Sequence, residues 1–325
     1  MRQALPPDDR EQLALLECLT RVIPVLGVGF QAYAAPVFQR CIATAQLQLQ
    51  LQAAPAGAAG AEYEPEFLVC ALDVVSSLVE GLGTSAESLA EAAQLRELVF
   101  VACADESPDV RQSGFALLGD LAKACPSHLL PVLRRCLEAC CATLATDALV
   151  QRYARAATNA CWAVGELALR APAEEVEACT LPLLQCMAGV LVMRLAVSKG
   201  TLENAGITLG RLALRCPAPM VPHLGSFAAP WCVALRRVRD SAEKEQAFAG
   251  LCALVAQNPM AVMPAFTELC NALASWRKLS DEALHRKMSE VLRGYQAHLP
   301  AEEWARAWGA LEPAVQDKLR QWFLS

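Results

Sequence analysis

Phe115-Ala-Leu-Leu-Gly-Asp-Leu-Ala is a short helical phrase that the chain repeats as Cys161-Trp-Ala-Val-Gly-Glu-Leu-Ala and as Ile207-Thr-Leu-Gly-Arg-Leu-Ala. The glycines that the copies share are 46 and 45 residues apart, at Gly119, Gly165 and Gly210. Fainter copies put a glycine 40 residues further on and a serine 43 residues earlier, at Gly250 and Ser76. A fixed period of this size is typical of a solenoid, in which each repeat packs on its neighbours. The period therefore favours a binding scaffold over a catalytic domain.

Each period contains helical runs separated by short breaks. The clearest start signal is Ser107-Pro-Asp, which supplies a cap residue, a proline in the first turn and an acidic side chain. From Ser107 to Leu121 the chain resembles the second helix of a HEAT repeat, and we expect Asp109 and Arg111 to bond the ends of neighbouring helices. We predict an all-α fold, a right-handed superhelical solenoid of HEAT repeats built from antiparallel helix pairs.

The helices and breaks divide the chain into three predicted parts. Residues 1–64 form a first HEAT repeat with an Ala/Gly-rich loop at 53–64, residues 65–275 form regular repeats, and residues 276–325 form C-terminal capping helices. The predicted helical runs include 128–146, a helix opening at 147, 174–193, 201–215, 221–239, 241–257 and 260–275. Each mid-helix glycine costs about 1 kcal/mol relative to alanine, so glycines at one register predict close backbone approach between stacked helices.

Composition restricts the partners and the cofactors. The 325 residues contain 28 Lys and Arg against 34 Asp and Glu, and this net charge of −6 disfavours nucleic acid and favours a basic partner. The 15 cysteines include no Cys-x-x-Cys pair, and the four histidines form no ligand motif. We therefore interpret the cysteines as reduced, small buried side chains, and we expect no metal and no other cofactor.

Neither an enzyme motif nor a membrane signal is evident in the sequence. The chain has no Gly-x-Ser-x-Gly, no phosphate-binding loop and no His-Glu-x-x-His, which predicts that it is not an enzyme. The longest apolar run, residues 181–197, is interrupted by Gln185 and Arg194 and is shorter than the roughly 20 residues of a spanning helix. Since residues 1–10 are polar and carry two prolines, we expect no signal peptide and no membrane segment.

One helical face is polar where a core face would be apolar. When the copies are aligned on their shared glycine or serine, the positions three before, one after and four after it lie on one face. These positions read Asp73, Ser77, Glu80, then Ala116, Asp120, Lys123, then Trp162, Glu166, Leu169, then Ile207, Arg211, Leu214. Carboxylates beside a large aromatic side chain indicate a stacked binding surface. Two interpretations stay open: Trp162 as a core residue or as part of that surface, and the carboxylates as solvated or capping groups.

Longer words occur in order along the chain: Ala71-Leu-Asp-Val-Val-Ser-Ser-Leu-Val-Glu-Gly-Leu-Gly, Val110-Arg-Gln-Ser-Gly-Phe-Ala-Leu-Leu-Gly-Asp-Leu, Trp162-Ala-Val-Gly-Glu and Leu202-Glu-Asn-Ala-Gly-Ile-Thr-Leu-Gly-Arg-Leu. They resemble the transportins, the karyopherin-β2 branch of the importin-β family. The resemblance implies a nuclear import receptor that shuttles between cytoplasm and nucleus and carries cargo with a proline-tyrosine nuclear localisation signal. In this family the GTPase Ran releases the cargo from the receptor. It covers the C-terminal arch of a longer protein, so the main sites for Ran and nucleoporins would lie N-terminal to this chain. A fragment, a truncated gene model and a diverged paralogue all stay open as the chain's origin.

The resemblance also implies a cargo-binding wall in this arch. Its positions fall on Val69, Asp73, Glu80, Asp120, Asn159, Trp162 and Ile207, with secondary candidates at Ala154, Thr158, Glu166, Glu203 and Asn204. Two of them, Ala154 and Thr158, stand where the family has a bulky aliphatic residue and an asparagine. The carboxylates would receive Arg and Lys of the signal, and Trp162 and Ile207 would accept its apolar or cationic side chains. The alternative is a HEAT-repeat scaffold that has lost transport activity.

Overall fold

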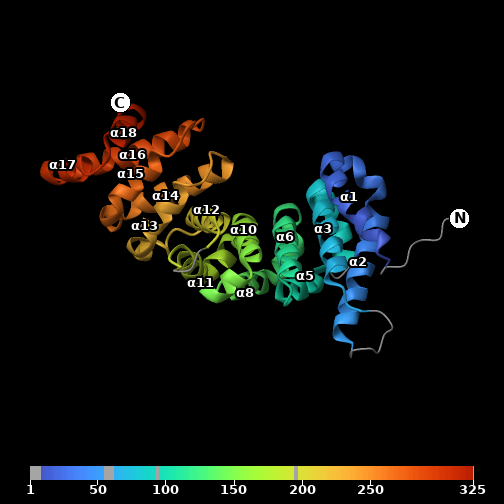
Figure 1. The fold of residues 1–325 in the computed structure, drawn as a ribbon. Helices are drawn as coiled ribbons and strands as arrows, with labels where there is room; N and C mark the ends of the chain where they lie inside the picture. Colours follow the sequence, from blue (N-terminus) through green and yellow to red (C-terminus); the bar gives the residue numbers. More distant parts are fainter. Residues whose placement is uncertain (1–8, 55–61, 93–94, 194–196, 325) are drawn as a thin grey trace. The chain divides into compact units, whose positions relative to one another are not determined.

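The computed structural model describes residues 9–54, 62–92, 95–193 and 197–324, and in these ranges the chain is helical without a β-strand. The predicted all-α class is therefore confirmed (Figure 1). The chain divides into two compact units, unit 1 (Met1–Arg170) and unit 2 (Ala171–Ser325), and each is described by itself. The predicted loop at 53–64 lies mostly outside the described residues, which resume shortly before a helix that begins at Pro65.

Unit 1 is a stack of antiparallel helix pairs. Its elements are α1 (Glu11–Leu26), η1 (Gly27–Phe30), α2 (Gln31–Ala53), α3 (Pro65–Leu82), η2 (Gly83–Ala86), α4 (Glu87–Ala92), α5 (Leu95–Ala104), α6 (Pro108–Ala124), α7 (Pro126–Leu129), η3 (Leu130–Val132), α8 (Leu133–Thr143), α9 (Asp147–Arg152) and α10 (Ala154–Arg170). Helices α3, α6 and α10 pack in one row, and α2, α5 and α8 each pack behind one of them (Figure 1). This arrangement is the HEAT-repeat packing that the period predicted.

Unit 2, taken by itself, also consists of two rows of packed helices. Its elements are α11 (Ala173–Leu191), α12 (Lys199–Arg215), η4 (Val221–His223), α13 (Leu224–Leu235), α14 (Ala242–Gln257), η5 (Pro259–Ala265), α15 (Phe266–Leu273), α16 (Glu282–His298), α17 (Ala301–Gly309), α18 (Pro313–Leu319) and a short π-helical turn, η6 (Arg320–Leu324). Helices α12, α14 and α16 pack in one row, and α11, α13 and α15 in the other.

Some predicted helices are broken by local features. The run predicted over 128–146 divides into α7, η3 and α8 around Pro131, whose nitrogen has no hydrogen to donate. The helix predicted to open at Asp147 stops at Tyr153, where φ is −115° and ψ is 42°, and resumes as α10. The break lets the long helix of this repeat begin again at Ala154, directly before the predicted site residues.

The glycines of the repeated phrase serve two different kinds of contact. A Cβ on Gly250 would lie 2.1 Å from the carbonyl oxygen of Gly210, so the backbones of α12 and α14 touch and the predicted close approach is confirmed there. At Gly119 the prediction is wrong, because the nearest neighbour is a side chain: a Cβ would lie 2.1 Å from Cζ3 of Trp162. The same register therefore admits a backbone in one repeat and an indole ring in another.

The polar residues that join helix ends differ in part from the prediction. Arg111 donates from Nε to the carbonyl oxygen of Asp105 at 2.8 Å and from Nη2 to that of Ala104 at 2.9 Å, so it bonds the end of α5 as expected. Asp109 is exposed, so the prediction that it bonds the end of a neighbouring helix is wrong. The buried carboxylate is Asp105, which accepts from the Ser107 amide at 2.7 Å and from Gln52 Nε2 at 3.0 Å.

Most cysteines are core side chains. Of the 15 cysteines, 11 are buried, three are intermediate and one is exposed, and all are free thiols. Burial raises the pKa of several of them, that of Cys41 to about 12, which keeps these thiols protonated at neutral pH.

Two helical stretches are long and apolar enough to cross a membrane by length and composition alone. They are Glu11–Ala53 and Pro65–Glu91, and the bent pair Ala242–Gln257 and Pro259–Leu273 would be a third if it counted as one span. The sequence prediction considered residues 181–197 and overlooked these stretches, so apolar length does not support the predicted absence of a span. The most apolar window of Pro65–Glu91 is 61% buried inside the structure.

Candidate peptide-binding surface

The carboxylates and the tryptophan predicted as a binding surface lie in unit 1, on three helices that pack side by side. Asp73 and Glu80 are on α3, Asp120 is on α6, and Asn159 and Trp162 are on α10. Helix α6 packs against both α3 and α10, so the three helices that carry these residues are neighbours in one row (Figure 1). All five are half-buried or exposed, and we call them the acidic face.

Trp162 is held in a fixed orientation by groups on two helices. Its ring lies directly against Gly119 of α6, where a Cβ would come within 2.4 Å of Cε3. Its Nε1 donates to Glu166 Oε1 at 3.0 Å, and Glu166 Oε2 accepts from Arg170 Nη1 at 2.5 Å. The Glu166 side chain is 5% exposed, so the bond to Arg170 offsets the cost of burying its charge. Trp162 is therefore half-buried, with its ring plane set by packing on one side and by a hydrogen bond at its edge.

Asp120 is a partly buried carboxylate with a perturbed acidity. Burial is the main cause that raises the pKa of Asp120 to about 6, and the neighbouring carboxylates of Glu80 and Glu166 raise this pKa further. The hydrogen bond from Ser76 Oγ and the charge of Lys123 act in the opposite direction and lower the pKa. The carboxylate is ionised at neutral pH and takes up a proton in mild acid. An ionised group that burial disfavours gains most from a cation brought beside it.

Asp73 repeats this environment one helix earlier. Burial raises its pKa, and a hydrogen bond from Ser113 opposes the rise. Ser113 belongs to α6 and is itself buried, so α3 and α6 are linked at this carboxylate. The acidic face thus contains two carboxylates, on neighbouring helices, that are both partly desolvated.

Among the other candidates of unit 1, two side chains bond to backbone carbonyl oxygens. Asn159 Nδ2 donates to the carbonyl oxygen of Gln112 at 3.1 Å, which joins α10 to α6. Thr158 Oγ1 donates to the carbonyl oxygen of Ala154 at 2.9 Å within α10, and Val69 on α3 is half-buried. The bonds of Asn159 and Thr158 to backbone carbonyl oxygens are structural.

The remaining predicted residues lie on α12, in unit 2. Ile207 is 5% exposed, and Arg211, at the position equivalent to Asp120, is 3% exposed and donates from Nε to Gln246 Oε1 at 2.9 Å. Glu203 and Asn204 are half-buried, and Glu203 Oε1 lies 3.3 Å from Lys199 Nζ. The structure therefore groups the carboxylates and Trp162 in unit 1, and it places Ile207 in the packed side of α12.

Sequence reasoning missed the groups that position the acidic face. Ser113 bonds Asp73, Ser76 bonds Asp120, and Gly119 supports Trp162. Arg170 had a readable signal, because it follows Glu166 by four residues and so shares its helix face. No sequence signal showed what the two serines and Gly119 would contact, since these contacts join different helices.

The acidic charge of the chain is concentrated in unit 1. Unit 1 has 12 Lys and Arg against 19 Asp and Glu, and unit 2 has 16 against 15, which gives −7 and +1. Within the described residues no group of three or more His, Cys, Asp or Glu is arranged to hold a metal ion.

Solved structures define the class of fold. The chain resembles Kap121p in its crystal structure bound to the SUMO protease Ulp1p, with a TM-score of 0.55 and 17% identity over 94% of this chain and 27% of that one. The fold is accordingly that of the karyopherin HEAT-repeat solenoids. No family model matches the chain.

Curated relatives identify the family within this class. The chain is 43% identical to transportin-1 of Oryza sativa subsp. japonica, over 98% of this chain and 35% of the relative. It is 37% identical to transportin-1 of Homo sapiens, over 93% of this chain and 33% of the relative. The chain belongs to the transportin family, and it spans about a third of the length of these relatives.

Proposed function

We propose that this chain is the cargo-binding part of a nuclear import receptor, and that its acidic face receives the basic part of a proline-tyrosine nuclear localisation signal. The observation that carries the proposal is the acidic face itself: Asp73, Asp120 and Trp162 on consecutive helices of the unit that holds the excess of acidic residues. Membership of the transportin family supports the transport role. A binding role also agrees with the absence of a catalytic motif in the sequence.

The chemistry of the acidic face suits arginine and lysine side chains. A guanidinium group lying on the open side of the Trp162 ring gains a cation–π contact, and a carboxylate nearby adds a charge-assisted hydrogen bond. Gly119, which touches the ring, directly precedes Asp120 in the chain, and Glu166, which bonds the ring, is close enough to Asp120 to raise its pKa. Both interactions are therefore available to one cation.

The helix spacing also suits an extended peptide. Packed helices are about 8–10 Å apart, and an extended chain rises about 3.3 Å per residue. Basic residues about three positions apart would then meet the carboxylates of α6 and α3 in turn. An extended, disordered signal satisfies this geometry without adopting a fold of its own.

The cellular role follows from the same proposal. The receptor would move between cytoplasm and nucleus, with Ran and nucleoporins as its further partners. A structure of the same fold, that of Kap121p, has been solved with the SUMO protease Ulp1p bound to it. Glu203 and Asn204 of α12 are half-buried and stay candidates for cargo contacts within unit 2, whereas Ile207 is buried and is not proposed as a contact.

A peptide titration tests the proposal. A fluorescent peptide with a basic stretch before a proline-tyrosine pair is titrated with the chain and with its Trp162→Ala and Asp120→Asn variants. Loss of a hydrogen bond to a charged group costs about 1.5–3 kcal/mol, and loss of a desolvated cation–π contact costs about 2 kcal/mol. Both variants should therefore bind roughly 10- to 100-fold more weakly. The matched control is Glu106→Gln, which removes one exposed carboxylate of unit 1 outside the acidic face and should bind as the original chain does.

Two results would count against the proposal. Equal affinity for all four proteins would exclude the acidic face as the site. Absence of binding to any of them would favour the scaffold alternative, a HEAT-repeat module without transport activity.

A further inference from the structure

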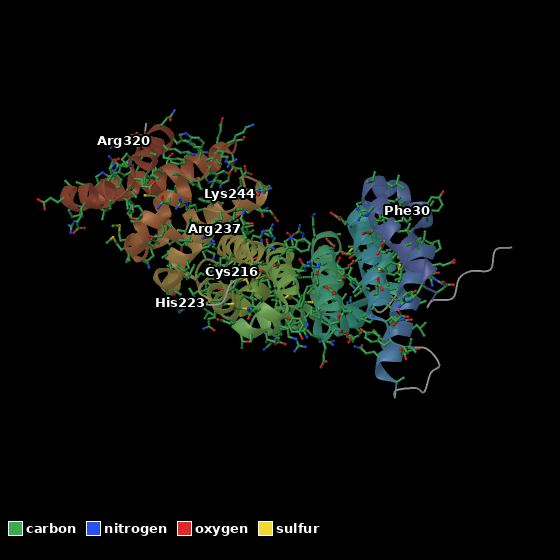
Figure 2. All side chains as sticks on the ribbon, viewed as in Figure 1. Phe30, Cys216, His223, Arg237, Lys244 and Arg320 are labelled. Atoms are coloured by element: carbon green, nitrogen blue, oxygen red, sulfur yellow. The ribbon has the colours of Figure 1, made fainter. Side chains whose placement is uncertain are left out.

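Two loops of unit 2 carry an unusual number of exposed cations. One joins α13 to α14 (residues 236–241), and the other joins α15 to α16 (residues 274–281). Together they present five exposed basic side chains, which we call the basic ridge: Arg236, Arg237, Arg239, Arg277 and Lys278. Arg237 and Lys244, the residue that anchors the first loop, are labelled in Figure 2.

Asp240 binds the two loops to each other. Its Oδ2 accepts from the amide of Arg277 at 2.8 Å and from that of Lys278 at 3.0 Å. Its Oδ1 accepts from Lys244 Nζ at 2.9 Å, and the Lys244 side chain is 1% exposed with its Nζ 4.4 Å from the ring centroid of Trp276. The cations of the two loops are therefore held close together by a buried anchor.

The acidic residues of these loops are already engaged. The two loops contain Asp240 and Asp281, and Asp281 Oδ1 accepts from the amides of Ala283 at 2.8 Å and Leu284 at 3.1 Å, which caps α16. The next carboxylate on α14, Glu243, lies 3.3 Å from Arg211 Nη2. Like charges gathered in this way repel one another, and an anion placed among them would relieve the repulsion.

We propose that the basic ridge binds an acidic peptide segment of a partner protein. Arginine pairs with carboxylates through two parallel hydrogen bonds, and three of the five side chains come from one short loop. A short acidic segment can engage the ridge locally, whereas a long nucleic acid would be repelled by the net charge of −6. A membrane surface fits poorly, because Val238 and Trp276, the large apolar residues beside these arginines, are buried.

This site is separate from the acidic face and does not depend on the function proposed for it. The two surfaces have opposite charge and lie in different units, so each would select a different kind of peptide. Binding at one can be abolished by substitutions that leave the residues of the other intact.

Fluorescence anisotropy with a labelled poly-glutamate peptide tests the basic ridge in the full chain. The variant Arg237→Gln/Arg239→Gln is compared with Arg286→Gln/Arg306→Gln, a control that removes two exposed arginines of unit 2 outside the ridge. We expect about tenfold weaker binding for the ridge variant, binding by the control like that of the original chain, and loss of binding at high salt. The ridge variant should bind the basic localisation-signal peptide with unchanged affinity.

Equal affinity of the two double variants for poly-glutamate would overturn the proposal. Tighter binding of the original chain to a single-stranded oligonucleotide of equal charge, or to phosphatidylserine vesicles, would also overturn it in favour of those partners.

Discussion

Gly119→Ala tests whether the repeated glycine exists to seat Trp162. The new Cβ would lie 2.1 Å from Cζ3 and 2.4 Å from Cε3 of the indole ring. A rigid ring cannot yield as a flexible side-chain end could. Trp162 must therefore leave its position and lose the bond to Glu166, or α10 must move away from α6.

The expected change in the free energy of unfolding is the difference between an overpacking cost and a gain in helix propensity. Overpacking of this kind costs about 1–3 kcal/mol, and replacing a helical glycine by alanine recovers about 1 kcal/mol. The control is Gly29→Ala in the same unit, because a Cβ there meets no atom within 4 Å. We expect Gly119→Ala to be about 1–3 kcal/mol less stable than this control in urea unfolding followed by circular dichroism.

A double variant isolates the contact. In Gly119→Ala/Trp162→Ala the ring that blocks the Cβ is gone, so the cost of the alanine should vanish and a coupling of about 1–3 kcal/mol should appear. The single variant should also bind the basic peptide more weakly, because the ring plane is displaced. The reasoning is refuted if Gly119→Ala is as stable as Gly29→Ala, or if its cost persists in the Trp162→Ala background.

Two further predictions concern pH. Asp120→Asn should stabilise unit 1 by up to about 3 kcal/mol at neutral pH, because burial raises the folded-state pKa to about 6 from 3.8. This advantage should shrink as pH falls through 6, where the folded carboxyl becomes protonated, and a difference that stays constant between neutral pH and about pH 4.5 would contradict it. His128 is buried with both ring nitrogens unpartnered among the described residues, and burial first and then Arg96 lower its pKa from 6.5. Stability should therefore fall as pH drops below about 6.5, and His128→Leu should remove that part of the slope in thermal melts, whereas an unchanged slope would exclude His128 as its source.

The fold was readable from the sequence because its determinants are local. Helix period, proline positions and the recurring glycine all act within one repeat, so the helix pairs fall close to the predicted ranges. The rotation of each helix is decided by its neighbours. Arg211 is buried although it is equivalent to Asp120, since α12 approaches α14 at Gly210 and turns that position against Gln246.

The candidate surface could be predicted from the sequence only in part, because only some of its determinants are local. Spacing placed Asp73, Asp120 and Trp162 on one face, and these residues do share a row in unit 1. Spacing could not show that Trp162 rests on Gly119, because that contact joins residues 43 positions apart on different helices. The sequence prediction named Asp109 and did not consider Asp105, since a start signal marks a helix end without showing which side chain turns inward.

The uneven division of charge, −7 in unit 1 and +1 in unit 2, has a kinetic consequence. A basic peptide is attracted by unit 1 before it touches any side chain, so long-range attraction raises the association rate constant. Salt screens this attraction over distances beyond about 10 Å but weakens close, partly buried contacts much less. Stopped-flow measurements should therefore show capture of a basic peptide slowing steeply with ionic strength while its release changes little. Under the proposed function, loading would depend on the medium and retention on the contacts of the acidic face.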